Sequence, residues 1–253
     1  MTIDLSGRVA LITGASSGLG AHFATVLAAA GAKVAACARR TDRLQALAQR
    51  IRGAGGVIEP ITMDVEDSAS IVAGFDAAEK ALGPVDITIA NAGLNAQGAS
   101  TELDADALAQ LVRVNIQGVY LTAREAAKRL IAGADPARGR IILLGSVGSQ
   151  KPLAGLTAYS MSKAAVAMMG KGLAREWARY GVTVNTICPG WIATELNAEW
   201  LAGEGGQKLV KTFPRRRVMA ADGLDGLVLL LASDASASIT GGVFAADEGQ
   251  ALA

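Results

Sequence analysis

Short apolar runs alternate with longer amphipathic stretches along nearly the whole chain. Seven runs have the length and composition of buried strands: residues 8–13, 33–38, 57–62, 85–90, 140–144, 182–188 and 243–246. Between them apolar residues recur at helical spacing, as Leu44, Leu47 and Ile51 do after the second run. Strands that alternate with helices predict a parallel sheet covered by helices on both faces. We therefore predict a single α/β domain over residues 1–253, built on a doubly wound parallel sheet of about seven strands.

Three further stretches change this outline. The segment 103–131 has helical periodicity with Asn115 in its middle, and asparagine is a poor residue for a helix interior. A hydrogen bond to a local backbone carbonyl is the simplest role for that side chain. The helix expected over 157–180 is apolar on more than one face, which predicts a second buried face against another copy of the chain. The segment 191–217 has no single period and is predicted to be a substrate lid, with an ordinary surface excursion as the alternative.

A glycine-rich loop follows the first strand and opens the first helix. It runs Gly14, Ala15, Ser16, Ser17, Gly18, Leu19, Gly20. Glycines let a backbone approach a pyrophosphate, and the helix N-terminus behind them offers unpaired N–H groups and a partial positive charge. A mobile turn between strand and helix has a similar composition. The position after the first strand favours a dinucleotide site that includes Ser16, Ser17 and Leu19.

The end of the second strand bears on the choice between NADP and NAD. Ala38 is followed by Arg39 and Arg40, where a carboxylate would bind the adenosine ribose and repel a 2′-phosphate. A charge-assisted hydrogen bond of ~1.5–3 kcal/mol corresponds to about 10- to 100-fold preference. We therefore predict NADP(H), with NAD(H) possible. Alternatively, Arg39 and Arg40 are solvated positions that open the next helix.

Polar residues follow the later strands at the same predicted edge of the sheet. Asp64 follows the third strand, where it can accept from an adenine amino group or cap the next helix; the sequence leaves both open. The turn Asn91, Ala92, Gly93 ends the fourth strand, and Ser146 follows the fifth. The carboxyl ends of parallel strands line one crevice, so Gly14 and Gly93 are expected to face the same ligand.

A tyrosine and a lysine stand four positions apart near the start of the helix at 157–180. Tyr159 and Lys163 therefore lie on one helix face. A free phenol titrates near ~10, and acid–base work at neutral pH needs a shift of about 3 units. A cation about 4 Å away favours the phenolate by roughly 4 kcal/mol, before desolvation opposes it. We expect Lys163 to lower the pKa of Tyr159, although an exposed amphipathic helix gives the same spacing.

Composition narrows the choice of partner and compartment. The net charge is +1 and no run of like charge occurs, so the sequence indicates no basic surface for binding nucleic acid or an anionic membrane. Cys37 and Cys188 lie in apolar runs, as buried thiols of a cytoplasmic protein do. No signal peptide or membrane-spanning stretch is expected. His22, the only histidine, is expected to be exposed, which argues against a histidine triad or a metal site.

Taken together and in this order, these motifs resemble the compact single-domain short-chain dehydrogenases/reductases over nearly the whole chain. The matching residues are Thr13, Gly14, Gly18, Gly20, Asp64, Val65, Asn91, Ala92, Gly93, Asn115, Ser146, Tyr159, Lys163, Pro189, Gly190 and Thr194. Two departures stand near the C-terminus: Asp247-Glu248-Gly249 replaces the usual Asp-Gly-Gly, and Met219 to Asp222 replaces a more usual Pro-Glu-Asp. Neither touches the chemistry, but both put in doubt the C-terminal packing that helps this family to form tetramers.

The resemblance implies a Rossmann fold and a role for each matching residue. Tyr159 would give or take the proton at the substrate oxygen, and Ser146 would hydrogen-bond that oxygen. Lys163 would hold the nicotinamide ribose and lower the phenol pKa, while Asn115 positions a water that continues the proton path. Thr194 and the backbone near Ile192, after Pro189 and Gly190, would bind the carboxamide. Val65 and Ala92 belong to the same implied cofactor surface.

The leading hypothesis is an oxidoreductase that transfers a hydride between NADP(H) and a ketone or secondary alcohol, with Tyr159 as the acid or base. The alternative among enzymes is an NAD-dependent alcohol dehydrogenase working in the oxidative direction. An alternative of another class is a catalytically silent nucleotide-sensing scaffold, although such proteins usually lose part of the Asn, Ser, Tyr, Lys set. The expected partners are a small, mainly apolar substrate and further copies of the chain, in a tetramer or dimer formed through 103–131 and 157–180.

Overall fold

The computed structural model describes residues 3–194 and 197–253, and these form one α/β unit around a single sheet. All neighbouring strands are parallel, in the order β3-β2-β1-β4-β5-β6-β7. The strands are β1 (Val9–Thr13), β2 (Lys33–Ala38), β3 (Val57–Thr62), β4 (Ile87–Ala90), β5 (Arg140–Leu144), β6 (Thr183–Pro189) and β7 (Val243–Ala246). The predicted doubly wound parallel sheet is confirmed, because the strand order reverses direction between β1 and β4.

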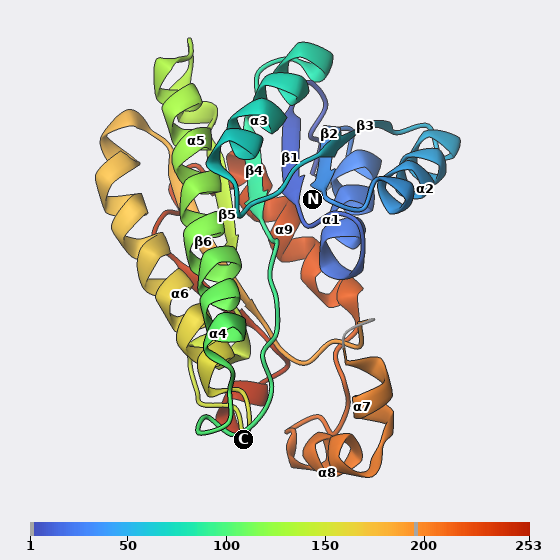
Figure 1. The fold of residues 1–253 in the computed structure, drawn as a ribbon. Coiled ribbons are helices and arrows are strands. Elements are labelled where there is room, and N and C mark those ends of the chain that lie inside the picture. Colours follow the sequence, from blue (N-terminus) through green and yellow to red (C-terminus); the bar gives the residue numbers. More distant parts are fainter. Residues whose placement is uncertain (1–2, 195–196) are drawn as a thin grey trace.

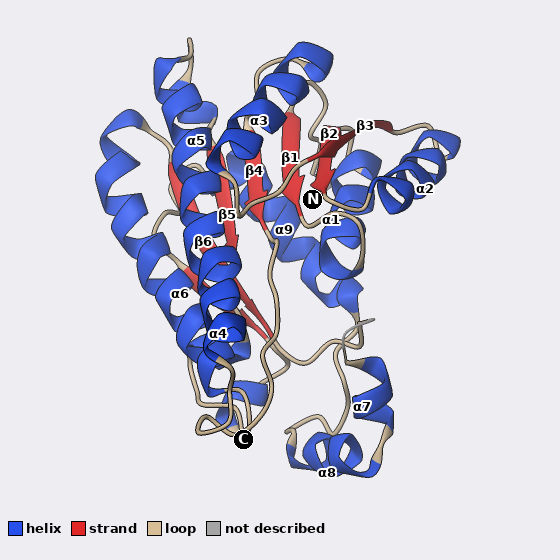
Figure 2. Ribbon diagram, viewed as in Figure 1, coloured by secondary structure: helices blue, strands red, loops and turns tan. Residues whose placement is uncertain are grey.

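Helices cover both faces of the sheet, as Figure 2 shows. The helices are α1 (Gly18–Ala29), α2 (Thr41–Gly53), α3 (Ser68–Leu82), α4 (Ala105–Val112), α5 (Val119–Ala132), α6 (Thr157–Trp177), α7 (Ala198–Ala202), α8 (Glu204–Thr212) and α9 (Asp225–Ala232). Phe23, Leu47 and Leu231 of α1, α2 and α9 pack in one core. Phe75, Ala123 and Val166 of α3, α5 and α6 pack in the other. No helix of the described ranges is long and apolar enough to cross a membrane.

The segment predicted to be helical over 103–131 contains a feature that its sequence pattern does not indicate. Between α4 and α5, residues Arg113–Gly118 form a π-helical turn, and Asn115 lies fully buried within it. A π-helical turn inserts an extra residue and therefore changes which side chains face the sheet. This insertion turns the asparagine inward, away from the helix surface.

The predicted lid, 191–217, leaves the carboxyl end of β6 and contains the short helices α7 and α8, drawn in orange in Figure 1. One of its apolar positions, Leu196, lies outside the described residues. Trp191, at the start of the segment, stacks on Trp200 of α7 with ring centroids 5.5 Å apart. The segment returns to the sheet where Met219 N–H donates to the carbonyl of Trp191 at 2.9 Å. Its two ends are therefore joined beside the sheet.

Candidate active site

A cavity of about 560 Å³ lies at the carboxyl ends of the central strands. Nearly all of the predicted site residues line it, although they come from segments far apart in the sequence: Gly14, Ser16, Ser17, Gly18, Leu19, Arg39, Arg40, Asp64, Val65, Asn91, Ala92, Gly93, Ser146, Tyr159, Lys163, Pro189, Gly190, Ile192 and Thr194. Gly20 and Asn115 are not among its lining residues. Both lie directly behind the surface that the others form.

The glycines of the β1–α1 loop are required by close packing. Gly14 has φ of +70°, and a Cβ on it would lie 2.9 Å from the Cα of Ala92. A Cβ on Gly20 would lie 2.3 Å from the carbonyl oxygen of Gly14. Thr13 joins the same two segments, because its hydroxyl oxygen accepts from the N–H groups of Asn91 and Ala92, each at 3.1 Å. The loops after β1 and β4 therefore form one compact floor.

The geometry of this floor fits a dinucleotide. Ser17 is the N-cap of α1, but its side chain makes no capping hydrogen bond, so the first N–H groups of this 12-residue helix are free of a side-chain cap. A Cβ on Gly18 would meet only Thr194 Cγ2, at 3.9 Å, so the loop surface there stays open. An unblocked helix N-terminus beside a glycine loop binds phosphate groups. The residues present therefore suit a pyrophosphate.

The far end of the cavity is charged and exposed. Arg40 donates to the Ser16 hydroxyl at 3.0 Å and to the Ser17 hydroxyl at 2.6 Å. Arg39 lies 3.4 Å from a carboxylate oxygen of Glu66 and 3.7 Å from one of Asp64. Arg40 therefore contacts the phosphate loop, and Arg39 lies beside two carboxylates.

Asp64 itself lines the cavity and does not cap the next helix. The cap of α3 is Asp67, which accepts from the N–H of Ala69 at 2.9 Å. Asp64 instead accepts from the N–H of Glu66 at 3.0 Å. Of the two roles that the sequence left open for Asp64, the capping role is therefore wrong. The side chain lines the cavity, and its role toward an adenine stays a prediction.

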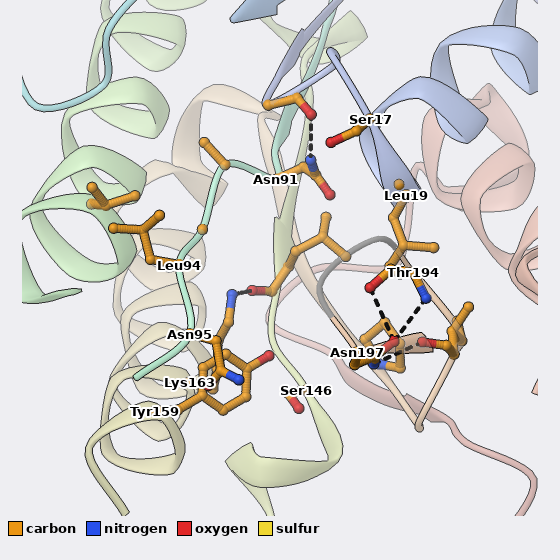
Figure 3. Close-up of a pocket in the computed structure, with 18 of the residues that line it drawn as sticks. Ser17, Leu19, Asn91, Leu94, Asn95, Ser146, Tyr159, Lys163, Thr194 and Asn197 are labelled. Carbon is orange, nitrogen blue, oxygen red and sulfur yellow. Dashed lines mark hydrogen bonds between the residues drawn. The ribbon is translucent and has the colours of Figure 1, made fainter. Parts of the chain in front are cut away.

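The opposite end of the cavity gathers the side chains with acid–base chemistry. Ser146 follows β5, and its hydroxyl oxygen accepts from the N–H of Gly148 at 3.1 Å. Tyr159 lies in the first turn of α6, and Figure 3 shows its oxygen and that of Ser146 pointing into the same part of the cavity. Lys163 lies one turn further and is buried, with Nζ 5.8 Å from the centre of the Tyr159 ring. Its ammonium donates to the carbonyl of Leu144 at 2.8 Å.

Burial dominates the protonation of this corner. It raises the pKa of the Tyr159 phenol, and the hydrogen bond with the Ser146 side chain opposes that rise. It also lowers the pKa of Lys163 to about 8. The pKa of the Tyr159 phenol is therefore raised, and the expected lowering is wrong. Burial of the phenol decides the direction, while the ammonium of Lys163 donates to the Leu144 carbonyl.

Asn115 reaches this corner from the π-helical turn. Its Oδ1 accepts from the N–H of Leu94 at 2.7 Å, and its Nδ2 donates to the Leu94 carbonyl at 2.9 Å and to the Ser162 hydroxyl at 3.0 Å. Ser162 in turn donates to the carbonyl of Tyr159 at 2.7 Å. The predicted local carbonyl partner is therefore wrong: Asn115 joins the loop after β4 to the first turn of α6.

The comparison with known proteins agrees with this geometry. The family described as short chain dehydrogenase matches residues 8–205. The chain belongs to this short-chain dehydrogenase family. A D-threitol dehydrogenase of Mycolicibacterium smegmatis is 34% identical over 98% of this chain and 94% of that protein. A solved gluconate 5-dehydrogenase of Burkholderia cenocepacia, in complex with NADP and tartrate, is 34% identical with a TM-score of 0.93, covering 100% of this chain and 98% of that one.

A further solved structure, of a putative gluconate dehydrogenase from Agrobacterium tumefaciens, is 30% identical with a TM-score of 0.94 and covers 100% of this chain and 99% of its own. The resemblance predicted from the motifs is thus confirmed. As a short-chain dehydrogenase, the protein is an NAD(P)-dependent oxidoreductase that acts on CH–OH groups. The nicotinamide cofactor supplies the redox chemistry, so the chain's own residues must bind, orient and move protons.

This short-chain dehydrogenase has an apolar wall beside Ser146 and Tyr159 that the sequence analysis did not include. Val147, Leu153 and Leu156 form a small buried cluster, against which Tyr159 and Trp191 pack. All five line the cavity, as do Asn95 and Asn197. The sequence does contain a signal, because a loop that links Ser146 to Tyr159 starts and ends at the corner of the cavity where both hydroxyls lie. Asn197 also fixes Thr194, whose N–H donates to Asn197 Oδ1 at 2.8 Å.

His22 differs from its expectation. It is partly buried, and its Nε2 lies 2.6 Å from a carboxylate oxygen of Asp225 on α9. The pair joins α1 to α9, on the opposite face of the sheet from Tyr159 and Lys163. Within the described ranges, 3–194 and 197–253, no cluster of three or more histidine, cysteine or acidic residues is arranged to hold a metal ion.

Proposed function

We propose that this short-chain dehydrogenase transfers a hydride between NADP(H) and a neutral ketone or secondary alcohol, with Tyr159 as the proton donor or acceptor. The observation that carries the proposal is the convergence of Tyr159, Ser146 and Lys163 at one end of a cavity with a phosphate-binding floor. When bound, the nicotinamide supplies or accepts the hydride. The protein must then protonate or deprotonate the substrate oxygen within hydrogen-bond reach.

Tyr159 and Ser146 are suited to hold that oxygen. In the reductive direction both hydroxyls donate to the carbonyl oxygen, and Tyr159 gives its proton as negative charge develops there. A raised pKa keeps the phenol protonated at neutral pH, which is the form needed for a proton donor. Preorganised donors in a desolvated site are worth more than the same donors in water. The oxidative direction needs the phenolate and depends more strongly on Lys163.

Lys163 and Asn115 support the transfer from behind Tyr159. Lys163 would hold the nicotinamide ribose hydroxyls through its ammonium. Gly93 lies beside both residues, since a Cβ on it would be in van der Waals contact with Asn115 Oδ1, at 3.4 Å, and with Lys163 Nζ, at 3.5 Å. We assign the water that Asn115 positions to this corner, where it would pass a proton onward from Lys163.

The choice of NADP(H) rests on the charged end of the cavity. Arg40 lies at the phosphate loop, and no carboxylate takes its place at the end of β2. Asp64, Val65, Asn91 and Ala92 complete the adenosine side of the proposed site. The gluconate 5-dehydrogenase neighbour that contains NADP supports this assignment. Fluorescence titration should give a lower Kd for NADPH than for NADH, and equal constants would contradict it.

The substrate is proposed to be neutral and mainly apolar. The charged side chains that line the cavity within the described residues are Arg39, Arg40, Asp64 and Lys163. The first three lie at the adenosine end, so the wall of Val147, Leu153, Leu156 and Trp191 offers no cation to a substrate carboxylate. Loss of one charge-assisted hydrogen bond costs roughly 1.5–3 kcal/mol, or about 10- to 100-fold in binding. Sugar acids, which relatives are named for, should therefore be poor substrates.

A panel of compounds tests this function directly. Aliphatic, aryl and cyclic ketones, the polyol threitol and a keto sugar acid are supplied with the matching cofactor, and NADPH absorbance is followed. We expect turnover of neutral cyclic or aryl ketones, with kcat/KM at least about tenfold above that of the acid. Preference for the keto acid would overturn the neutral-substrate assignment. A complete lack of turnover with either cofactor would overturn the proposed reaction.

We further propose that copies of the chain associate through the helices 103–131 and 157–180. Large apolar side chains are exposed there: Leu108, Tyr120, Met161 and Met168, of which Met168 is 67% exposed. Large apolar side chains exposed on neighbouring segments favour an interaction surface. Light scattering should give a dimer or tetramer, and Met168→Lys should shift the protein toward the monomer.

The two free buried cysteines suit a cytoplasmic location.

A further inference from the structure

Two turns on the substrate side contain the two non-glycine residues with positive φ among the described residues. Glu248, after β7, has φ of +55°, and Arg216, after α8, has φ of +50°. A residue with a side chain is strained in this region and stays there only where its surroundings hold it. The two turns are in contact, because Arg215 and Arg217, on either side of Arg216, bind Glu248.

The contact is an ion-pair cluster on one carboxylate. Glu248 Oε2 accepts from Arg217 Nε at 2.9 Å, while Oε1 accepts from Arg217 Nη2 at 2.5 Å and from Arg215 Nη1 at 3.3 Å. The Glu248 side chain is only 16% exposed, whereas the two arginines are 61% exposed. Two parallel bonds to one guanidinium fix its orientation as well as its distance. The left-handed conformation at Arg216 brings both neighbours to the same acceptor.

The turn that contains Glu248 also holds the other end of the 191–219 segment. Gln250, almost fully buried, accepts from the N–H of Trp191 at 2.7 Å through its Oε1. The carbonyl of Trp191 accepts from Met219, two residues after Arg217. Trp191 lines the cavity and packs against the apolar wall. The turn 247–250 therefore binds both ends of the segment 191–219. Gln250 binds Trp191 at its start, and Glu248 binds Arg215 and Arg217 near its end.

We propose that Glu248 is a positioning residue for the substrate side of the site. Through Arg215 and Arg217, Glu248 joins the C-terminal end of the segment 191–219 to the turn 247–250, which also binds Trp191. This proposal rests on the proposed function for its kinetic readout, but its structural readout is independent of turnover. Loss of the carboxylate should leave the cofactor floor intact and loosen the tryptophan wall, which raises KM for the ketone.

Three variants test this role. Glu248→Gln keeps the left-handed residue and removes the charge; Glu248→Gly removes the charge and the backbone strain together; Arg217→Gln removes the partner. The matched control is Glu204→Gln, which breaks an exposed ion pair with Lys208 within α8. We expect the first three to raise KM for the ketone about fivefold, with kcat and NADPH affinity within about twofold of wild type. The control should match wild type.

Two further measurements separate positioning from general stability. Acrylamide quenching of tryptophan fluorescence should increase in the three variants and in wild-type protein at high salt, but not in the control. Glu248→Gly should melt no lower than wild type, because strain relief offsets the lost ion pairs. Wild-type quenching and KM in both Glu248 variants would overturn the proposal, as would equal losses in kcat, NADPH affinity and melting temperature. If no ketone is turned over, quenching alone still decides the role of Glu248.

Discussion

The two ends of the cavity use charge in opposite ways. At the end proposed for the adenosine, Arg39 is 56% exposed and Asp64 39% exposed, so water screens both charges. At the catalytic end, Lys163 is 4% exposed and Ser146 7%, and apolar residues close the wall around them. An interaction between charges is therefore strong at the buried catalytic end and weak at the exposed end. The chemistry should depend on single groups, and cofactor preference on a sum of small contributions.

Among the groups that support Tyr159, the largest effect is expected from removing the Ser146 hydroxyl. Ser146→Ala should lower kcat by about 10²- to 10³-fold, the usual cost of one preorganised donor at a developing oxyanion. Stopped-flow measurement of NADPH oxidation with a neutral ketone checks this. Ser160→Ala is the matched control, because that buried hydroxyl lies in α6, accepts from the N–H of Leu153 at 3.4 Å and does not line the cavity. Equal losses in both variants would show that desolvation at this end gives no special weight to Ser146.

Lys163→Met should reveal the free-energy cost of the buried ammonium. The folded pKa is depressed to about 8 from 10.5, so the folded state holds this proton less tightly than the unfolded chain does. The charged lysine therefore destabilises the fold by about 3 kcal/mol below pH 8, and the penalty fades as pH rises toward 10.5. Replacing it removes the penalty, less the cost of leaving the Leu144 carbonyl without its donor.

Urea unfolding of both proteins at neutral and alkaline pH measures that cost. The stability advantage of Lys163→Met over wild type should shrink by roughly 2 kcal/mol between pH 7 and pH 9.5. The difference between the two proteins cancels the titration of other groups, such as the buried thiol of Cys37, whose pKa burial also raises. A difference that does not change with pH would show that Lys163 is not desolvated as described.

The smallest effect is expected at the exposed end. Arg40→Ala should weaken NADPH binding by about tenfold and leave NADH unchanged, and salt should reduce the gap. Arg39→Ala should have a smaller effect, because Arg40 contacts the hydroxyls of the phosphate loop whereas the contacts of Arg39 are with Glu66 and Asp64. Arg50→Ala, at the other end of α2, removes the same charge as a control. Loss of NADPH and NADH affinity to the same degree would contradict a role in binding the 2′-phosphate.

Much of the fold follows from local patterns. The apolar runs locate every strand to within two residues, because buried parallel strands leave little room for polar side chains. Their carboxyl ends must share one edge, so the glycine loop, Asn91, Ser146 and the start of α6 could be brought together without coordinates. The roles assigned to the individual side chains stay predictions.

The remainder depends on tertiary contacts that no local pattern contains. Asn115 binds the Leu94 backbone because a π-helical turn rotates it inward, and no helical period predicts that insertion. The pKa of Tyr159 is set by how deeply the phenol is buried, which its spacing from Lys163 does not give. Glu248 departs from the common glycine pattern, but only the folded chain places Arg215 and Arg217 against it.

The proposed role of Tyr159 as proton donor is tested most directly by removing its hydroxyl oxygen. Tyr159→Phe deletes the proposed proton donor and keeps the ring that packs against the apolar wall. Single-turnover mixing with NADPH and a ketone that wild type reduces should show loss of hydride transfer, while fluorescence titration gives an unchanged Kd for NADPH. Turnover at the wild-type rate in this variant would contradict the assignment of Tyr159 and the mechanism built on it.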